Sequence, residues 1–198
     1  MRSPKAKSLP RFAKMILVGT GLFTAMLAII LTIYIVRDGN FYLDYSISRY
    51  VGRELWSAIF FAVVNFALAW LVWEYLKQLW PKYGQAWRVV MIIMLVGFVG
   101  LSLCPLGLFD ANYGDYGVIS ILHQIFSRGM FFFMAIAAGI AGWKQKQNKW
   151  IFGLCLAYVI CAITMMIMSF TAKIFWDFNF IFESVYIYLF YALLILLV

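Results

Sequence analysis

The side chains best suited to chemistry lie in one stretch, from Asp110 to Gly142. It begins with a short acidic loop, DANYGDYG, and continues as an apolar run of helix length. The polar residues early in that run are Ser120, His123, Gln124, Ser127 and Arg128. Their offsets of i, i+3, i+4, i+7 and i+8 predict one face of an α-helix. An imidazole and a guanidinium on one face could move a proton and hold an anionic group.

A second polar stripe, Asn179, Glu183 and Tyr186, has the spacing i, i+4 and i+7. By helix rise, Arg128 lies about 16 Å below Gly117, and Glu183 lies about as deep as His123. An arginine near the bilayer centre costs about 2.5–3.5 kcal/mol on insertion scales, so it should not face lipid. Its side chain should lean back toward the helix N-terminus. We therefore expect the two stripes to pack together and form a polar pocket open to the outside.

A third group of polar residues precedes the second apolar run. The loop from Tyr45 to Glu54 carries the candidate ligand-binding residues Ser46, Ser48, Arg49 and Arg53. Arginine forks and hydroxyls in such a loop can hold an anionic headgroup. A salt-bridged lid without a ligand is the alternative, and the sequence does not decide between them.

Each ionisable candidate also has a purely structural interpretation. His123 is the only histidine, and a lone histidine is more often a hydrogen-bonded core residue than a catalyst. Arg128 and Glu183 could form an ion pair that only fixes helix register. In an enzyme, His123 would be the general base, oriented by Glu183 or Asp110. One histidine cannot build a multi-histidine zinc site and no CxxC motif occurs, so we expect neither a metal nor another cofactor.

Composition predicts an integral membrane protein. Of 198 residues, 66% are hydrophobic and 12% charged, whereas a soluble domain carries about 25% charged residues. Runs long enough to cross a bilayer recur, which predicts an all-α, polytopic bundle of six transmembrane helices in a single domain, 1–198. The expected spans are about 15–36, 55–73, 89–109, 118–143, 150–170 and 178–198. The net charge of +8 does not indicate nucleic acid, because the basic residues flank the spans.

The placement of lysine and arginine predicts the orientation. Five basic residues precede the first span, and three lie in each of the links 74–88 and 144–149. The link 110–117 has none. The positive-inside rule then places both termini in the cytoplasm. We expect a multi-pass protein of the plasma (inner) membrane of a prokaryote.

Several residues carry expectations about helix packing. Pro105 should kink or end the third span. The small residues Ala135, Ala138, Gly139 and Gly142 predict a close helix contact. Asn65 and Thr164 are expected to form hydrogen bonds between helices. The link 74–88 is expected to turn at Pro81 and Gly84. The aromatic residues in and just before this link are expected to form an interfacial belt, namely Trp73, Tyr75, Trp80, Tyr83 and Trp87.

The chain resembles a family of six-span membrane proteins known as domain of unknown function nine-nine-eight. The matching positions are Ser46, Ile47 and Ser48 before the second span, Pro105 at the end of the third and His123 in the fourth. The resemblance implies a six-helix bundle and no established activity. Arg128 and the long aromatic link 74–88 depart from the pattern.

The two polar stripes and the polar first loop favour a binding or accessory protein whose outward pocket holds a lipid headgroup or a small polar ligand. The expected partner is membrane lipid, with a partner membrane protein or a homo-oligomer as further options and no nucleic acid. One alternative is an enzyme acting on a lipid at the outer leaflet. A transporter or channel subunit ranks third, because no internal repeat is evident.

Overall fold

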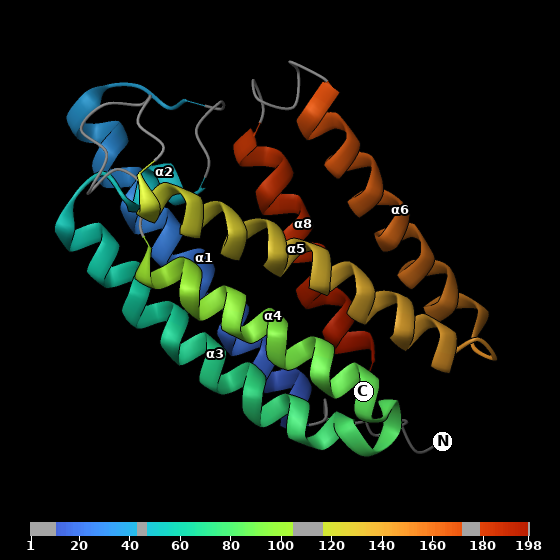
Figure 1. Ribbon diagram of the computed structural model, residues 1–198. Coiled ribbons are helices and arrows are strands. Elements are labelled where there is room, and N and C mark those ends of the chain that lie inside the picture. Colours follow the sequence, from blue (N-terminus) through green and yellow to red (C-terminus); the bar gives the residue numbers. More distant parts are fainter. Residues whose placement is uncertain (1–10, 43–46, 105–116, 172–178, 198) are drawn as a thin grey trace, which may run out of the picture.

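The computed structural model describes residues 11–42, 47–104, 117–171 and 179–197 (Figure 1). These residues form α1 (Arg11–Asp38), α2 (Ile47–Val51), α3 (Leu55–Tyr83), α4 (Gln85–Leu103), α5 (Val118–Lys144), α6 (Lys149–Thr171) and α8 (Asn179–Leu196). No strand occurs within the described ranges. Every helix except α2 is long and apolar enough to cross a membrane. For the described residues, the all-helical class is therefore confirmed, as are six helices with the length and composition of membrane spans.

The long helices lie side by side, and consecutive ones run in opposite directions (Figure 1). α3 and α4 form a hairpin that packs between α1 and α5, and α8 contacts α1, α5 and α6. α6 lies at the edge of the bundle, where most of its side chains are exposed. We call the end of the bundle that carries α2 the α2 end. The opposite end, where α3 turns into α4, is the hairpin end.

The link between the second and third spans is much shorter than expected. α3 continues through Pro81 to Tyr83, and Gly84 alone separates it from α4. Pro81 lies in the last turn of α3, so the hydrogen bond lost with its missing N–H and the strain from its ring fall at the end of the helix. Gly84 has a φ of 85°, a conformation that favours glycine, and its N–H bonds to Trp80 O at 2.9 Å. The expected turn at Pro81 was wrong, and the one at Gly84 is confirmed.

Three of the five expected belt aromatics lie in the core. Tyr75, Tyr83 and Trp87 are at most 1% exposed. Their polar atoms bond to backbone carbonyls of other segments. The Tyr75 hydroxyl donates to Leu194 O of α8, and Trp87 Nε1 donates to Ala137 O of α5 at 3.1 Å. The Tyr83 hydroxyl donates at 3.0 Å to Leu197 O, just after α8. These residues therefore join helices instead of anchoring the bundle to a membrane surface.

Small residues bring α5 close to both neighbours. A Cβ on Gly142 would lie 2.7 Å from Cys155 Cβ of α6, which confirms a close contact at the end of the expected seam. A second close contact, not anticipated, lies between α4 and α5. A Cβ on Gly100 would lie 2.6 Å from the Phe126 ring. α5 is thus held between α4 and α6 by glycines on both sides.

Of the two residues expected to form hydrogen bonds between helices, Asn65 is confirmed and Thr164 is wrong. Asn65 Nδ2 of α3 donates to Ser102 Oγ of α4 at 2.8 Å, and both side chains are buried. Thr164 is exposed, and its hydroxyl forms no hydrogen bond within the described part of the chain. α4 ends at Leu103, two residues before Pro105, which itself lies outside the described residues.

Candidate functional site

His123 is buried where α5 meets the end of α4. Its Nδ1 lies 2.6 Å from the carbonyl oxygen of Cys104, the residue that follows α4. A carbonyl can only accept, so Nδ1 carries the proton of the neutral ring and Nε2 presents its lone pair. The bond satisfies one of the carbonyls left without a partner at the end of a helix. His123 therefore has a structural role in joining α5 to α4.

Glu183 holds the short helix α2 in place. Its Oε2 accepts a hydrogen bond of 2.8 Å from the backbone N–H of Ile47, the first residue of α2. A carboxylate suits this position because the N–H groups of the first helical turn have no partner within the helix. α2 is further fixed by Tyr50, whose ring stacks on Phe41 at 5.7 Å and meets Phe180 edge-on at 5.8 Å. α8 thus positions the loop that precedes α3.

α5 and α8 meet at Phe131 and Tyr186. The Tyr186 hydroxyl donates to Phe131 O at 2.9 Å, and the two rings are T-shaped at 5.3 Å. Both helices run from the α2 end toward the hairpin end (Figure 1). Arg128 and Glu183 each precede this contact by three residues, about 4.5 Å along the helix. The register therefore brings these two residues to the same level.

The polar residues of both stripes continue from this contact toward the α2 end. Gln124, Ser127 and Phe131 have the spacing i, i+3 and i+7, so they share one face of α5. On α8, Asn179 and Glu183 share the face of Tyr186 in the same way. Asn179 is buried, Gln124 and Ser127 are half-buried, and Arg128 is exposed. We use the name α5–α8 face for these residues: Gln124, Ser127, Arg128 and Phe131 of α5, and Asn179, Glu183 and Tyr186 of α8.

Three side chains of the α5–α8 face have unused hydrogen-bonding groups. Within the described part of the chain, the side chains of Gln124, Ser127 and Asn179 form no hydrogen bond. By contrast, Thr20, Thr24 and Ser102 of other spans bond to the carbonyl four residues earlier. Polar groups inside a membrane are costly unless a partner satisfies them. The α5–α8 face therefore carries polar side chains that have no hydrogen-bond partner among the described residues.

The remaining candidates of the first loop do not join this face as one cluster. On α2, Ser48 is buried and Arg49 is half-buried. Arg53 lies after α2 on the side of α1, with its Cζ 4.9 Å from the centre of the Tyr34 ring. Ser46 and Asp110 lie outside the described residues, so the proposed role of Asp110 in orienting His123 stays a prediction.

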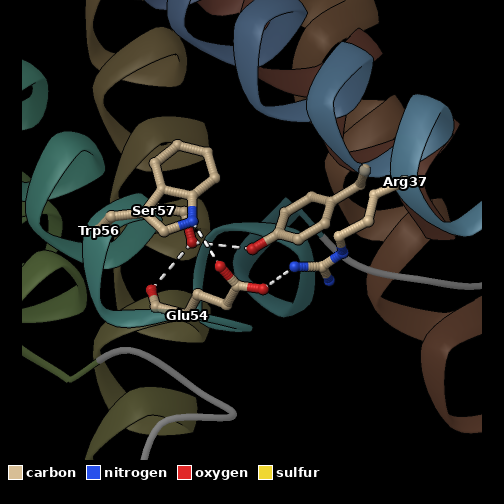
Figure 2. A network of polar contacts seen from close by, with 5 residues as sticks. Arg37, Glu54, Trp56 and Ser57 are labelled. Carbon is tan, nitrogen blue, oxygen red and sulfur yellow. Dashed lines mark hydrogen bonds and ion pairs between the residues drawn. The ribbon is translucent and has the colours of Figure 1, made fainter.

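A polar network that the sequence analysis did not predict joins the end of α1 to the start of α3. Figure 2 shows Glu54 between Arg37, at the end of α1, and Trp56, at the start of α3. Arg37 forms an ion pair with Glu54 Oε1, and Trp56 Nε1 donates to Glu54 Oε2 at 2.5 Å. Arg37 Cζ also lies 5.1 Å from the centre of the Tyr34 ring. The available signal was charge: Arg37, Arg53 and Glu54 flank the end of one span and the start of the next.

Comparison with models of known protein families, with curated proteins and with solved structures finds no match in any of the three. The resemblance to domain of unknown function nine-nine-eight thus rests on the short motifs alone. Of their positions, Ile47 and Ser48 form the start of α2, and His123 bonds to the end of α4. Ser46 and Pro105 lie outside the described residues.

Proposed function

We propose that this multi-pass membrane protein binds a lipid headgroup or a small polar ligand at the α2 end of the bundle, as a binding or accessory subunit. By the charge bias of the links, the α2 end faces away from the cytoplasm. The membrane would be the plasma (inner) membrane of a prokaryote. We also propose that the chain is a member of the family known as domain of unknown function nine-nine-eight.

The observation that carries this proposal is the set of unused hydrogen-bonding groups on the α5–α8 face. The side chains of Gln124, Ser127 and Asn179 support binding of a polar ligand, since none of them forms a hydrogen bond with a described residue. Only one oxygen of Glu183 takes part in a hydrogen bond among the described residues, so the other can receive a donor of the ligand or of Arg128. Arg128, at the level of Glu183, would hold an anionic group of the ligand.

Native mass spectrometry of the purified protein, with its lipids retained, tests the proposal. Glu183→Gln keeps an oxygen that can accept the Ile47 N–H but removes the negative charge. We expect the wild-type protein to carry a bound lipid or polar molecule, and Glu183→Gln to lose it at unchanged thermal stability. Val185→Ala, at an exposed position of the same helix, serves as the control. Full retention of the bound molecule by Glu183→Gln would refute the proposal.

One observation favours an enzyme as the second candidate. The bond to Cys104 O leaves the Nε2 lone pair of His123 able to accept a proton, as a general base requires. Arg128 would then hold the anionic group of a lipid substrate. Within the described residues the ring is oriented by a backbone carbonyl, while Glu183 bonds to Ile47. A turnover product in the mass spectrum, absent from His123→Asn, would favour this candidate over a binding protein.

A further inference from the structure

The turn between α5 and α6 carries three lysines at the hairpin end of the bundle (Figure 1). α5 ends at Lys144 and α6 begins at Lys149, and both helices have the length and composition of membrane spans. Lys146 lies between them, and all three lysines are exposed. We call residues 144–149 the α5–α6 turn. It places three cations at the point where one apolar helix ends and the next begins.

The charges of these lysines are not neutralised by the part of the chain that the structure describes. Within it, the ammonium groups of Lys144 and Lys149 form no ion pair and no hydrogen bond. Lys146 Nζ lies 5.0 Å from the centre of the Trp143 ring, and contact with an aromatic ring leaves the positive charge in place. All three lysines therefore keep their charge for an anion from outside the protein.

Acidic residues lie away from the α5–α6 turn. The stretch 116–176 contains no Asp and no Glu. Glu74 of α3 is paired with Lys77, with 2.6 Å between Oε1 and Nζ. The other acidic residues of the described ranges belong to the α2 end: Asp38, Glu54 and Glu183. The potential at the turn is therefore positive, and it attracts anions.

Two tryptophans flank the lysines and indicate the level of the turn in the membrane. Trp143 is 66% exposed and Trp150 is 84% exposed. Tryptophan at the end of a span is typical of the membrane interface, where its ring lies among the lipid headgroups. Lysine side chains beside such rings extend toward the headgroup phosphates. The turn therefore combines the two side-chain types that an anionic lipid surface attracts, cations and interfacial rings.

The α5–α6 turn is fixed to the bundle by hydrogen bonds. Gln145 Nε2 donates to the Tyr83 hydroxyl, at the end of α3, at 3.1 Å. Asn148 N–H donates to Gln145 O at 2.8 Å, and Asn148 Oδ1 accepts from Ile151 N–H at 3.3 Å. Because the backbone of the turn is already held, little conformational entropy is lost when an anion binds to it.

We propose that the α5–α6 turn binds the headgroups of anionic phospholipids in the leaflet next to the hairpin end, through its three lysines. By the charge bias of the links, this is the cytoplasmic leaflet. Phosphatidylglycerol should bind better than phosphatidylcholine, because the choline cation of the latter is repelled by the lysines. The turn shares no residue with the α5–α8 face, so this proposal stands or falls separately from the proposed function.

Titration of the purified protein in a neutral detergent with phosphatidylglycerol, with bound lipid counted by native mass spectrometry, tests the proposal. The glutamine variant combines Lys144→Gln, Lys146→Gln and Lys149→Gln. We expect its affinity for phosphatidylglycerol to fall roughly tenfold, as for the loss of several lysines near an anionic surface. Its affinity for phosphatidylcholine should not change. An arginine variant, with Lys→Arg at the same three positions, keeps the charge and should keep the binding.

The matched control removes the same charge from the same end of the bundle. It combines Lys14→Gln, Lys77→Gln and Arg88→Gln. Lys77 is already paired with Glu74, and Arg88 Cζ lies 4.2 Å from the centre of the Trp80 ring. This control variant should keep most of the affinity for phosphatidylglycerol, because the α5–α6 turn is unchanged.

Four results would overturn the proposal. The glutamine variant could bind as the wild type does, or lose no more than the control variant, which would indicate attraction by net charge alone. The arginine variant could lose as much as the glutamine variant, which would assign the effect to the structure of the turn. Displacement of the lipid by inorganic phosphate at constant ionic strength would assign the turn to a soluble anion. Melting temperatures show whether each variant is folded, and Glu183→Gln should leave the difference between the glutamine and control variants intact.

Discussion

At the scale of single residues, the two ionisable side chains that the sequence singled out both bond to the backbone of another element. His123 bonds to Cys104 O after α4, and Glu183 accepts from Ile47 N–H at the start of α2. Both bonds satisfy groups that helix ends leave without partners. Each residue therefore has a structural role in addition to its proposed functional role. A useful substitution changes one of these roles and keeps the other.

The variants His123→Asn and His123→Leu separate the two roles. Asparagine can place an N–H near the position of Nδ1 and keep the bond to Cys104 O, whereas leucine leaves that carbonyl without a donor. We expect His123→Leu to lower the free energy of unfolding by about 1–3 kcal/mol and His123→Asn to lower it by much less. Unfolding in a denaturing detergent series measures both. Equal losses would contradict a role for this hydrogen bond.

Residue spacing in the sequence was enough to find the polar faces of α5 and α8, because helical periodicity is a local property. It was not enough to find the partners. Nothing near His123 in sequence indicates a carbonyl 19 residues earlier, and Glu183 and Ile47 are 136 residues apart. The cluster of Tyr34, Arg37, Arg53 and Glu54 was missed for the same reason, since the helices must pack before these side chains meet.

At the scale of elements, α2 depends on its neighbours, because five residues cannot form a stable helix alone. We expect Glu183→Leu to release α2, since leucine cannot accept the Ile47 N–H, while Glu183→Gln keeps it in place. Hydrogen exchange of the peptide that covers residues 47–51 should then be faster in Glu183→Leu than in Glu183→Gln. Equal exchange in both would show that Tyr50 and its ring contacts alone hold α2.

The contact between α5 and α6 gives a second prediction for elements. Gly142→Ala would place a methyl group 2.7 Å from Cys155 Cβ, so α6 must shift. We expect a loss of about 1–3 kcal/mol in the free energy of unfolding, as for other overpacked sites. Gly153→Ala in α6 is the control, because its Cβ would meet nothing within 4 Å. It should be neutral or stabilising by up to about 1 kcal/mol. Similar effects for both substitutions would refute the close contact.

Element boundaries were predicted less well than element types. Apolar length was sufficient to find all six spans. The link 74–88 was predicted to be a loop because lysines, tryptophans and Pro81 are typical of one. In the structure, α3 continues to Tyr83. Packing decides this case: Tyr75 and Tyr83 are buried and bond to carbonyls at the end of α8 and just after it, so the helix is stabilised beyond the apolar run.

At the scale of the whole molecule, the charge bias predicts that the hairpin end faces the cytoplasm. Cysteine labelling tests this in a background without native cysteines. A membrane-impermeant maleimide should label Asn40→Cys, at the α2 end, in intact cells. It should label Lys146→Cys, between α5 and α6, only after permeabilisation. Both positions are exposed. The reverse pattern would invert the orientation and place the proposed ligand site on the cytoplasmic side.

The hydrogen bonds that end α8 bear on how the molecule is assembled during synthesis. Lys82 Nζ and the Tyr83 hydroxyl donate to the carbonyl of Leu197, the residue after α8, at 2.9 and 3.0 Å. The Tyr75 hydroxyl donates to Leu194 O, in the last turn of α8. All three donors belong to α3, which the ribosome makes more than a hundred residues earlier. Until α8 has been synthesised, the Lys82 ammonium and the hydroxyls of Tyr75 and Tyr83 need other hydrogen-bond partners, such as water or lipid headgroups. Arrival of α8 replaces those partners, so closure of the hairpin end is a late event in biogenesis.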